Sequence, residues 1–464
     1  MQRRAFLSSA AALAATPLVA AEPSSEGEPS GDYIKRERPL RVGLIGSGWY
    51  GKVDLFRLLQ ITNAEVVSVC DVDSQMAANA AAEIARRQKS GNTPKLYPSY
   101  DKLIAAGGID AVVIGTPDHW HALPTVAACK AGLDVWVQKP ISVDIREGQA
   151  MVEAARQHDR VVQVGLQRRS TPHLARAKRE IVEAGLLGEV AHAEVCCYYH
   201  MRPGANPEPT EPPANLDYDG WTGPAPMRPY TELQHPRKWR AFTEYSNGIV
   251  GDMCVHMYDA VRWTLGLSWP QQVHSTGGIL VQTDALANTT DTQVATFDHL
   301  HESLPQSPNG LSVAWTHRSW GDAPDPDYPW AYKLYGSKGT LKADVNKFEF
   351  VPRGGGETIR GDALIEYEKY PEDKTEKDLE RHVASAIREH MRDWVRCLDS
   401  RERPVADIEQ GHISTASCIL ANISRDLGRS LRWDPQANAV IDDDEANARL
   451  KREYRAPYEH PFNG

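Results

Sequence analysis

The stretch Arg41–Asp73, RVGLIGSGWYGKVDLFRLLQITNAEVVSVCDVD, decides the fold of this chain. An apolar run at 42–45 predicts a short buried strand, and the run ends in the glycine-rich sequence GSGWYG at 46–51. A helical pattern follows, and a second apolar run, 66–69, leads to Asp71. A lone G-x-G-x-x-G is weak evidence, but here it stands between a strand and a helix with an acidic residue at the expected distance. This context predicts a dinucleotide-binding βαβ unit.

The three glycines and the acidic residue have distinct expected roles. Gly46 permits the tight turn, Gly48 lets the backbone approach a pyrophosphate, and Gly51 lets the helix pack closely on the strand. The helix N-terminus offers free N–H groups and the positive end of its dipole to phosphates. Asp71 would bind ribose hydroxyls and repel a 2′-phosphate, so NAD is expected rather than NADP; the alternative is an ordinary turn without a ligand. The predicted cofactor contacts here are Gly46, Ser47, Gly48, Trp49, Tyr50, Gly51 and Asp71.

Residues 1–21 are typical of an export signal. Arg3 and Arg4 precede an Ala- and Leu-rich run that ends in small residues, the order found in a signal peptide. Paired arginines predict a twin-arginine signal, and hence the twin-arginine export machinery as a partner of the precursor; a chance Arg-Arg before an ordinary secretory signal is the alternative. The apolar run is too short to span a membrane, so no stable membrane anchor is expected. Residues 22–38, rich in Pro, Ser and Glu, are expected to be a flexible tether.

Composition narrows the class of protein. The 464 residues suffice for two or three domains, and the 41% hydrophobic and 25% charged residues are ordinary for a globular protein. A formal net charge of −10 without a basic cluster argues against nucleic acid as a partner. The seven cysteines form no C-x-x-C pair, so we expect free thiols and no structural metal.

The pattern of apolar runs predicts an α/β domain followed by an α+β domain. Strands alternate with helices over residues 39–168, which favours a doubly wound parallel sheet of the Rossmann type. Residues 169–464 contain alternating strand patterns with few helices between them, which favours a large, mostly antiparallel open sheet. Helices near 381–399 and 410–427 should cover one side of that sheet. The Pro-rich but aromatic segment 201–240 is expected to be a long ordered loop over a site.

Three motifs resemble the glucose–fructose oxidoreductase / inositol dehydrogenase / MocA (Gfo/Idh/MocA) family. They are VGLIGSGWYG, TPDHWHALPTVAACKAGLDVWVQKP and GIVGDMCVHMYD, and the tail RERPVADIEQGHISTASCILANISRDLGRSLRWDP is similar to an exported branch of that family. The resemblance covers residues 38–464. It is specific for the fold and the plan of the site, and much less specific for the substrate.

Lys139 is the first catalytic candidate. It ends a Rossmann strand before Pro140, which fixes the backbone and could aim the ammonium into the cleft at the carboxyl edge of the sheet. There it would stabilise an oxyanion on the substrate, whereas the alternative is a surface lysine after a strand. The resemblance implies the catalytic role and usually has Glu before this lysine. Gln138 departs from that pattern, which puts the tuning of the lysine in doubt.

The resemblance implies that Asp252 and His256 complete the catalytic group. Their spacing of four places both on one face of a helix, and an imidazole suits proton transfer near neutral pH. A buried structural Asp–His pair and a divalent-metal site are the alternatives. Asp259 is expected to orient the helix rather than react, and His119 to be a loop residue.

The remaining predicted site residues fall into two groups. The resemblance implies cofactor contacts at strand ends, with Asp118 standing where the family often has Asn; these contacts are Thr116, Pro117, His121, Gln138, Lys139 and Gln167. Aromatic and basic side chains would suit a sugar or polyol; these are Arg168, Trp221, Trp239 and Arg240. The alternative for the two tryptophans is that they only fix the Pro-rich loop.

Together these features predict an exported, periplasmic NAD(H)-dependent oxidoreductase acting on a carbohydrate or similar alcohol, with tightly bound NAD. An NAD-dependent glycoside hydrolase, which oxidises, eliminates and re-reduces, would use the same residues. A sugar-binding protein without turnover is a third reading, supported only by Gln138. A sheet with one face covered by helices also predicts a homo-oligomer.

Overall fold

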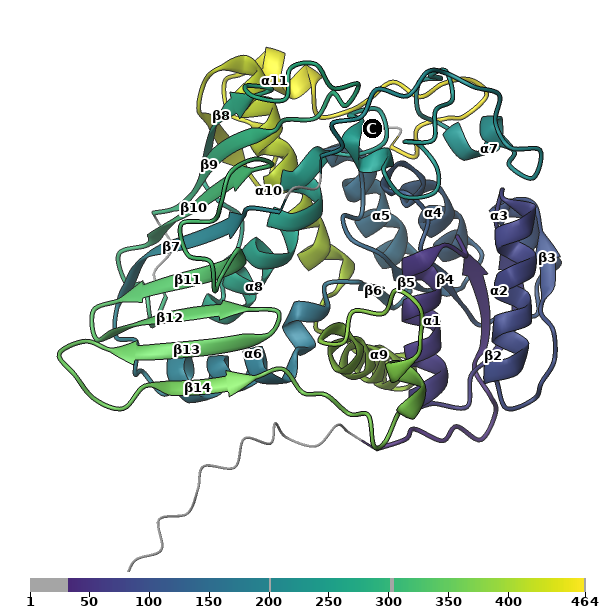
Figure 1. Ribbon diagram of the computed structural model, residues 1–464, viewed down its shortest axis with the longest axis horizontal. Coiled ribbons are helices and arrows are strands. Elements are labelled where there is room, and N and C mark those ends of the chain that lie inside the picture. Colours follow the sequence, from purple (N-terminus) through teal and green to yellow (C-terminus); the bar gives the residue numbers. More distant parts are fainter. Residues whose placement is uncertain (1–31, 200–201, 301–303, 463–464) are drawn as a thin grey trace, which may run out of the picture.

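The structure is a computed structural model that describes residues 32–199, 202–300 and 304–462. The signal peptide predicted for residues 1–21 lies outside these described residues. Two sheets organise the chain, and Figure 1 shows them side by side, with the N-terminal parallel sheet on the right and a larger sheet on the left. The predicted combination of a Rossmann domain and a second domain built on an open sheet is confirmed.

The N-terminal sheet has six parallel strands in the order β3-β2-β1-β4-β5-β6, the doubly wound order of a Rossmann domain. The direction of winding reverses between β1 and β4, and ligands bind beyond the carboxyl ends of strands at such a switch point. The strands are β1 Arg41–Ile45, β2 Glu65–Cys70, β3 Lys95–Tyr97, β4 Ala111–Ile114, β5 Asp134–Val137 and β6 Val162–Val164. The helices are α1 Trp49–Ile61, α2 Ser74–Arg87, α3 Tyr100–Ala106, α4 Ala122–Lys130 and α5 Ile145–Gln157.

The second sheet has ten strands in the order β14-β13-β12-β11-β7-β10-β9-β8-β15-β16. Neighbours run antiparallel except for β7 and β10, which are parallel. The strands are β7 Val190–Cys197, β8 Gln272–Gly278, β9 Thr292–His299, β10 Leu311–Arg318, β11 Trp330–Gly336, β12 Gly339–Asp344, β13 Lys347–Pro352, β14 Ile359–Asp362, β15 Leu431–Asp434 and β16 Ala439–Val440. The sequence pattern missed β14, β15 and β16, which are short and lie at the two edges of the sheet.

Helices from residues 169–464 pack on both domains. The helices are α6 Pro172–Ala177, α7 Tyr218–Thr222, α8 Val255–Leu265, α9 Val383–Ser400, α10 Ile408–Leu427 and α11 Asp444–Ala448. Helix α8 packs on β7 and β11, and α10 packs between β8 and the Rossmann helix α5. Helix α9 packs against α1, with Trp394 against Trp136 of β5 at 5.9 Å between ring centroids. The prediction that α9 covers the second sheet is therefore wrong, because its apolar face completes the Rossmann core (Figure 1).

Residues 32–38, the end of the predicted flexible tether, are held against the Rossmann domain. The N–H of Ile34 donates to the carbonyl of Ile61 (2.8 Å), and the N–H of Arg36 donates to Oδ1 of Asn63 (2.8 Å). This part of the tether is thus bound to the end of α1, which corrects that prediction for these residues. All seven cysteines are free, as expected. Among the described residues no helix is long and apolar enough to span a membrane.

The C-terminal segment 449–462 crosses both domains. Its Leu450 carbonyl accepts hydrogen bonds from the first two N–H groups of α5 (both 3.1 Å). The N–H of Arg455 donates to the carbonyl of Pro224 (2.9 Å), in the loop that precedes β8. The Tyr458 ring meets Trp120 edge to face at 5.4 Å between centroids. The segment therefore fastens the Pro-rich loop to the Rossmann domain.

Candidate functional site

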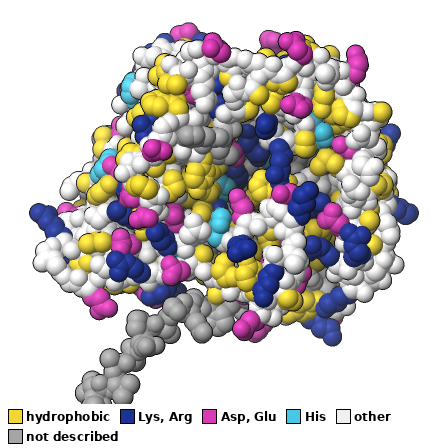
Figure 2. Space-filling view, viewed as in Figure 1, with side chains coloured by type: hydrophobic (Ala, Val, Ile, Leu, Met, Phe, Trp, Pro, Cys, Tyr) yellow, Lys and Arg dark blue, Asp and Glu magenta, His cyan; other side chains and the backbone are white. Residues whose placement is uncertain are grey.

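A cavity of about 870 Å³ lies between the carboxyl edge of the Rossmann sheet, the Pro-rich loop and the second domain. It runs from the glycine-rich turn and Asp71 to Lys139, Asp252 and His256. Figure 2 shows Lys, Arg and His side chains gathered near the middle of the face between the two domains. The three predicted catalytic residues and most of the predicted cofactor residues thus line one continuous space.

The glycine-rich turn has the steric properties expected of a pyrophosphate site. Gly46 has φ +83°, and a Cβ on Gly51 would lie 2.1 Å from the carbonyl oxygen of Gly46, so both positions require glycine. At Gly48 the nearest atom to an added Cβ is the tip of Met76, at 3.6 Å, so this glycine faces free space. No side chain caps the first turn of α1. The free space at Gly48, which a Cβ would occupy, and the uncapped N–H groups of α1 together fit the phosphates of a dinucleotide.

Asp71 lies at the end of β2 and lines the same cavity. Its Oδ2 accepts hydrogen bonds from the backbone N–H (2.8 Å) and the hydroxyl (2.7 Å) of Ser47, and its Oδ1 accepts the N–H of Asp73 (2.9 Å). Burial raises the pKa of Asp71, while these three donors act in the opposite direction. The carboxylate is therefore held in a fixed orientation at the ribose end of the site. Ser47 is buried and acts through Asp71.

The other predicted cofactor residues divide into two sets. Thr116 and Pro117, which follow β4, line the cavity. Trp49 and Tyr50, which begin α1, line it as well. His121 does not, because its ring nitrogens face the carbonyls of Pro140 (2.7 Å) and Thr116 (2.9 Å). The His121 ring thus braces the turns that carry the site. Gln167 is also buried outside the cavity lining.

Gln138 is held by a carboxylate that the sequence pattern did not reveal. Its Nε2 donates to Oδ2 of Asp54 in α1 (2.6 Å), and the Trp136 indole donates to the same oxygen (2.9 Å). Burial raises the pKa of Asp54 to about 7. The Gln138 Oε1 accepts the backbone N–H of Lys139 (3.2 Å). A buried acid therefore orients the residue before Lys139.

Lys139, Asp252 and Arg240 form a buried ion cluster. The Lys139 ammonium donates to Oδ1 (2.6 Å) and to the backbone carbonyl (2.9 Å) of Asp252. The Arg240 guanidinium pairs with the same Oδ1 at 3.1 Å and with Asp118 at 3.6 Å. The two cations lower the pKa of Asp252 against the effect of its burial. Burial raises the pKa of Asp118 to about 7.

His256 lies in the first turn of α8, one turn after Asp252 in the π-helical segment Val250–Cys254. Its ring meets Trp330 edge to face at 5.6 Å between centroids, and its Nδ1 has no hydrogen-bond partner among the described residues. Burial, together with the charges of Lys139, Arg168 and Arg240, holds the pKa of His256 well below 6.5. The imidazole is therefore neutral at neutral pH and can accept a proton. Asp252 pairs with Lys139, so the alternative of a structural Asp–His pair does not describe these contacts.

The predicted substrate residues differ in their surroundings. Arg168 and Arg240 line the cavity. Trp221 and Trp239 also line it, but both belong to the apolar cluster of the Pro-rich loop. The Trp221 carbonyl accepts hydrogen bonds from the His119 ring (3.0 Å) and the Trp120 indole (2.9 Å). The two tryptophans thus both wall the cavity and fix the loop.

Trp330 and Tyr199 are site residues that the sequence analysis missed. Trp330 begins β11, and its indole donates to the carbonyl of Met253 (3.1 Å). Tyr199 follows β7 and lies against Trp330 at 6.0 Å between ring centroids. An aromatic residue at the start of an ordinary strand carries no local signal. Only the pairing of β11 with β7 brings both rings to the cavity.

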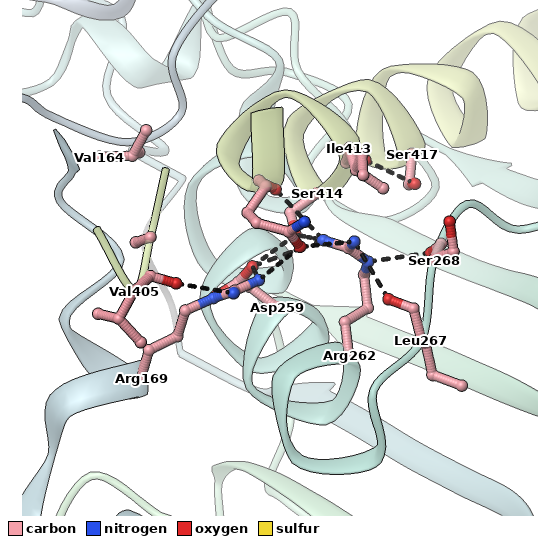
Figure 3. A network of polar contacts seen from close by, with 12 residues as sticks. Val164, Arg169, Asp259, Arg262, Leu267, Ser268, Val405, Ile413, Ser414 and Ser417 are labelled. Atoms are coloured by element: carbon pink, nitrogen blue, oxygen red, sulfur yellow. Dashed lines mark hydrogen bonds and ion pairs between the residues drawn. The ribbon is translucent and has the colours of Figure 1, made fainter. Parts of the chain in front are cut away.

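A second buried network joins α8, which carries His256, to α10 and to the segment after β6. Asp259 accepts two hydrogen bonds from Arg169, which follows β6 (both 2.8 Å), and one from the hydroxyl of Ser414 in α10 (2.7 Å). Figure 3 shows Arg169, Asp259 and Arg262 drawn together between three segments of the chain. The expectation that Asp259 orients the helix and does not react agrees with these contacts.

One group of side chains among the described residues has the spacing of metal ligands. Atoms of Asp144, Glu147 and His460 lie within 4.8 Å of one another. Each already has a partner, since Asp144 caps α5 and pairs with His460 (3.0 Å), and Glu147 accepts a hydrogen bond from Tyr454. These contacts attach the C-terminal segment to α5.

The fold and the site define a Rossmann-type dinucleotide-binding protein with a buried Lys–Asp–His group. Residues 40–166 match the sequence model of the Gfo/Idh/MocA oxidoreductase family, described as its NAD-binding Rossmann fold. Residues 176–300 and 367–460 match the C-terminal alpha/beta domain of the same family. The chain belongs to the Gfo/Idh/MocA family, and its N-terminal domain is an NAD-binding domain.

Individual relatives agree with this assignment. The Myo-inositol 2-dehydrogenase of Thermotoga maritima is 23% identical over 85% of this chain and 99% of its own length. A glycosyl hydrolase family 109 protein of Stenotrophomonas maltophilia is 28% identical over 44% of this chain and 43% of its own length. The chain spans less than half the length of some curated relatives, with 42% and 43% in two of them.

Solved structures show the same fold. The scyllo-inositol dehydrogenase of Lactobacillus casei, with bound NAD(H) and scyllo-inositol, superposes with a TM-score of 0.58. It is 18% identical, and the match covers 85% of this chain and 99% of that one.

Proposed function

We propose that this protein is an NAD(H)-dependent oxidoreductase that acts on a CH–OH carbon of a sugar, polyol or sugar derivative. The observation that carries the proposal is that Lys139, Asp252 and a neutral His256 share one cavity with the glycine-rich turn. Relatives named as inositol dehydrogenases support this class of substrate.

The residues divide the chemistry between them. NAD, when bound, supplies the hydride acceptor or donor. His256 accepts the proton of the substrate hydroxyl, because its lowered pKa keeps the imidazole neutral and its Nδ1 has no partner among the described residues. The Lys139 ammonium, fixed by Asp252 at 2.6 Å, stabilises the negative charge on that oxygen. Trp330 lines the cavity beside His256 and would cover one side of a bound sugar.

The test of this proposal starts with the cofactor content of the purified protein. We expect denaturation to release NAD, and a sugar substrate to change the nicotinamide absorbance of the native protein. His256→Ala should retain the nucleotide and lose the absorbance change. A wild-type protein without nucleotide affinity, or a sugar-dependent change that survives in His256→Ala, contradicts the proposal.

We also propose that NAD is held tightly. The Pro-rich loop covers the cavity, and the C-terminal segment fastens this loop through Arg455 and Tyr458. A retained cofactor suits an exported enzyme, since free NAD is scarce in the periplasm. NAD that exchanges completely during a single gel-filtration run would contradict tight binding.

Export by the twin-arginine route remains a proposal based on Arg3 and Arg4. A fold whose two domains enclose the cofactor site supports it, because that route carries folded proteins. Replacing both arginines by lysine should leave the precursor in the cytoplasm. Normal accumulation of the double variant in the periplasm would exclude the route.

An NAD-dependent glycoside hydrolase is the alternative proposal. The relative from Stenotrophomonas maltophilia supports it over its matched region, and the mechanism uses the same residues. Steady release of nitrophenol from p-nitrophenyl glycosides, without an added electron acceptor, would favour the hydrolase. Absence of release together with sugar-dependent reduction of NAD would favour the oxidoreductase.

A homo-oligomer built on the open sheet face is a further proposal. Side chains along β10 alternate between buried and partly exposed, so in the single chain only one face of the sheet is covered. The open face carries the exposed Val294 and Tyr335 among polar side chains. A monomer in sedimentation at micromolar concentration would contradict the proposal.

A further inference from the structure

Arg168 is a buried cation in the cavity wall without a counter-ion. Its side chain is 1% exposed, and its Nε and Nη1 have no hydrogen-bond partner among the described residues. No carboxylate of the described chain lies within ion-pair distance of it. Burial lowers the pKa of Arg168, and acidic groups farther away only partly oppose that effect. A buried guanidinium with free donors is costly unless a ligand supplies an anion.

Three other cations of the cavity lining are different, because each has a carboxylate. Lys139 pairs with Asp252 at 2.6 Å, and Arg240 pairs with Asp252 and with Asp118. Arg237, which also lines the cavity, pairs with Asp378 at 3.2 Å. Arg168 differs from these three in having no carboxylate within ion-pair distance among the described residues; the cavity-lining Glu380 acts on it only from farther away.

The position of Arg168 relates it to the reacting carbon. Its guanidinium lies over the Trp330 ring at 5.3 Å from the centroid, and the same ring contacts His256. One aromatic ring thus separates the free guanidinium from the proton acceptor. A monosaccharide lying along this ring could present an acidic group to the guanidinium and a CH–OH group to the imidazole.

A second unpartnered group strengthens the site. Nε2 of His382 is buried without a hydrogen-bond partner, and His382 lines the cavity. Burial, and next the charge of Arg168, lower the pKa of His382 to about 3. The ring is therefore neutral, and it lies close enough to Arg168 for that charge to affect its pKa.

We propose that Arg168 binds the carboxylate of the substrate, so that the substrate class is a sugar acid rather than a neutral polyol. This inference rests on the proposed oxidoreductase function. The planar guanidinium offers two parallel N–H donors that match a carboxylate. A carboxylate brings one negative charge to this one guanidinium, whereas a phosphate monoester carries about −1.5 to −2 at pH 7.

The test compares acids with their parent sugars on the NAD-loaded protein. Isothermal titration with D-glucuronate, D-galacturonate and D-mannuronate, each beside its neutral sugar, gives a ratio of dissociation constants. For at least one pair we expect the acid to bind about 10–100-fold more tightly, the scale of a charge-assisted bidentate contact. Arg168→Gln should abolish this preference, and Arg168→Lys should reduce it. Arg237→Gln, which removes a paired cation from the same cavity, should keep it.

The outcomes separate this inference from the function on which it rests. Equal binding of acids and neutral sugars, or an acid preference that survives in Arg168→Gln, overturns the inference. A His256-dependent absorbance change with neutral sugars only would overturn it while the oxidoreductase stands. Stronger Arg168-dependent binding of glucose 6-phosphate overturns the choice of a carboxylate. Loss of nucleotide from Arg168→Gln with an unchanged acid preference would assign the arginine to the cofactor instead.

Discussion

The two ends of the cavity are built in different ways. At the cofactor end, recognition depends on backbone: glycines at 46, 48 and 51, a helix start and one carboxylate, all within residues 41–73. At the substrate end it depends on polar side chains that arrive on separate segments, such as Lys139 after β5, Arg240 in the Pro-rich loop and His256 in α8. The first end follows from local sterics, and the second exists only once both domains are folded.

The largest expected effect is a loss of turnover from substitutions at the substrate end alone. His256→Ala should lower turnover by about 10²–10⁴-fold, the scale of positioned acid–base catalysis. Lys139→Met should also lower turnover. The fold-loss in turnover of the double variant should be smaller than the product of the two single fold-losses, because both residues act on one hydroxyl. Single-turnover absorbance and nucleotide content measure this. Near-normal turnover of a folded, NAD-loaded His256→Ala protein would contradict the assignment of His256 as the proton acceptor.

The next largest effects concern the cofactor end, where one glycine substitution should lower stability and another should lower NAD binding. Gly51→Ala should lower the free energy of unfolding by about 1–3 kcal/mol, because its Cβ would lie 2.1 Å from the Gly46 carbonyl oxygen. Gly48→Ala has room for its Cβ in the protein, so it should keep the melting temperature and lose NAD. Thermal unfolding and nucleotide content distinguish them. Equal destabilisation by both variants would show that Gly48 has a packing role only.

The pH dependence tests how the buried charges act on His256. Because its pKa lies well below 6.5, activity should persist at pH 6 and fall only at lower pH. Arg240→Gln removes one of the charges responsible and should move the acid limb of kcat/KM upward, by about 1 pH unit. Unfolding takes up a proton between the lowered pKa and 6.5, so this group makes stability fall as pH falls below 6.5. An acid limb that does not move in Arg240→Gln would contradict this account.

The smallest expected effect concerns cofactor choice. Asp71→Ala should weaken the preference for NAD over NADP by about tenfold, since the carboxylate that repels a 2′-phosphate is gone. Ser47→Ala is the matched control: it removes one donor to Asp71 and should leave most of the preference. Titration of nucleotide-free protein with both cofactors measures the ratio. Equal affinity of the wild-type protein for NAD and NADP would show that Asp71 does not discriminate.

Sequence reasoning recovered the parts of the molecule that have local causes. The parallel sheet and most strands of the second sheet follow from apolar periodicity, and the turn at 46–51 follows from its glycines. It missed Trp330 and Asp54, because their roles depend on β11 lying beside β7 and on α1 packing under β5. It placed His121 at the cofactor because of its position after a strand, although both ring nitrogens face carbonyls. Contacts between segments this far apart in the chain leave no periodic pattern in the sequence.

Helix α9 has a consequence for the order in which the chain can fold. Its apolar face, with Met391 and Trp394, belongs to the same core as β1 and α1, yet it is synthesised more than two hundred residues after β6. During synthesis, residues 39–168 therefore emerge with an incomplete core, because the face of α1 that packs on α9 is not yet covered. The dinucleotide site is finished only when almost the whole chain has left the ribosome. Expression of residues 39–168 alone removes part of the core of the domain it is meant to isolate.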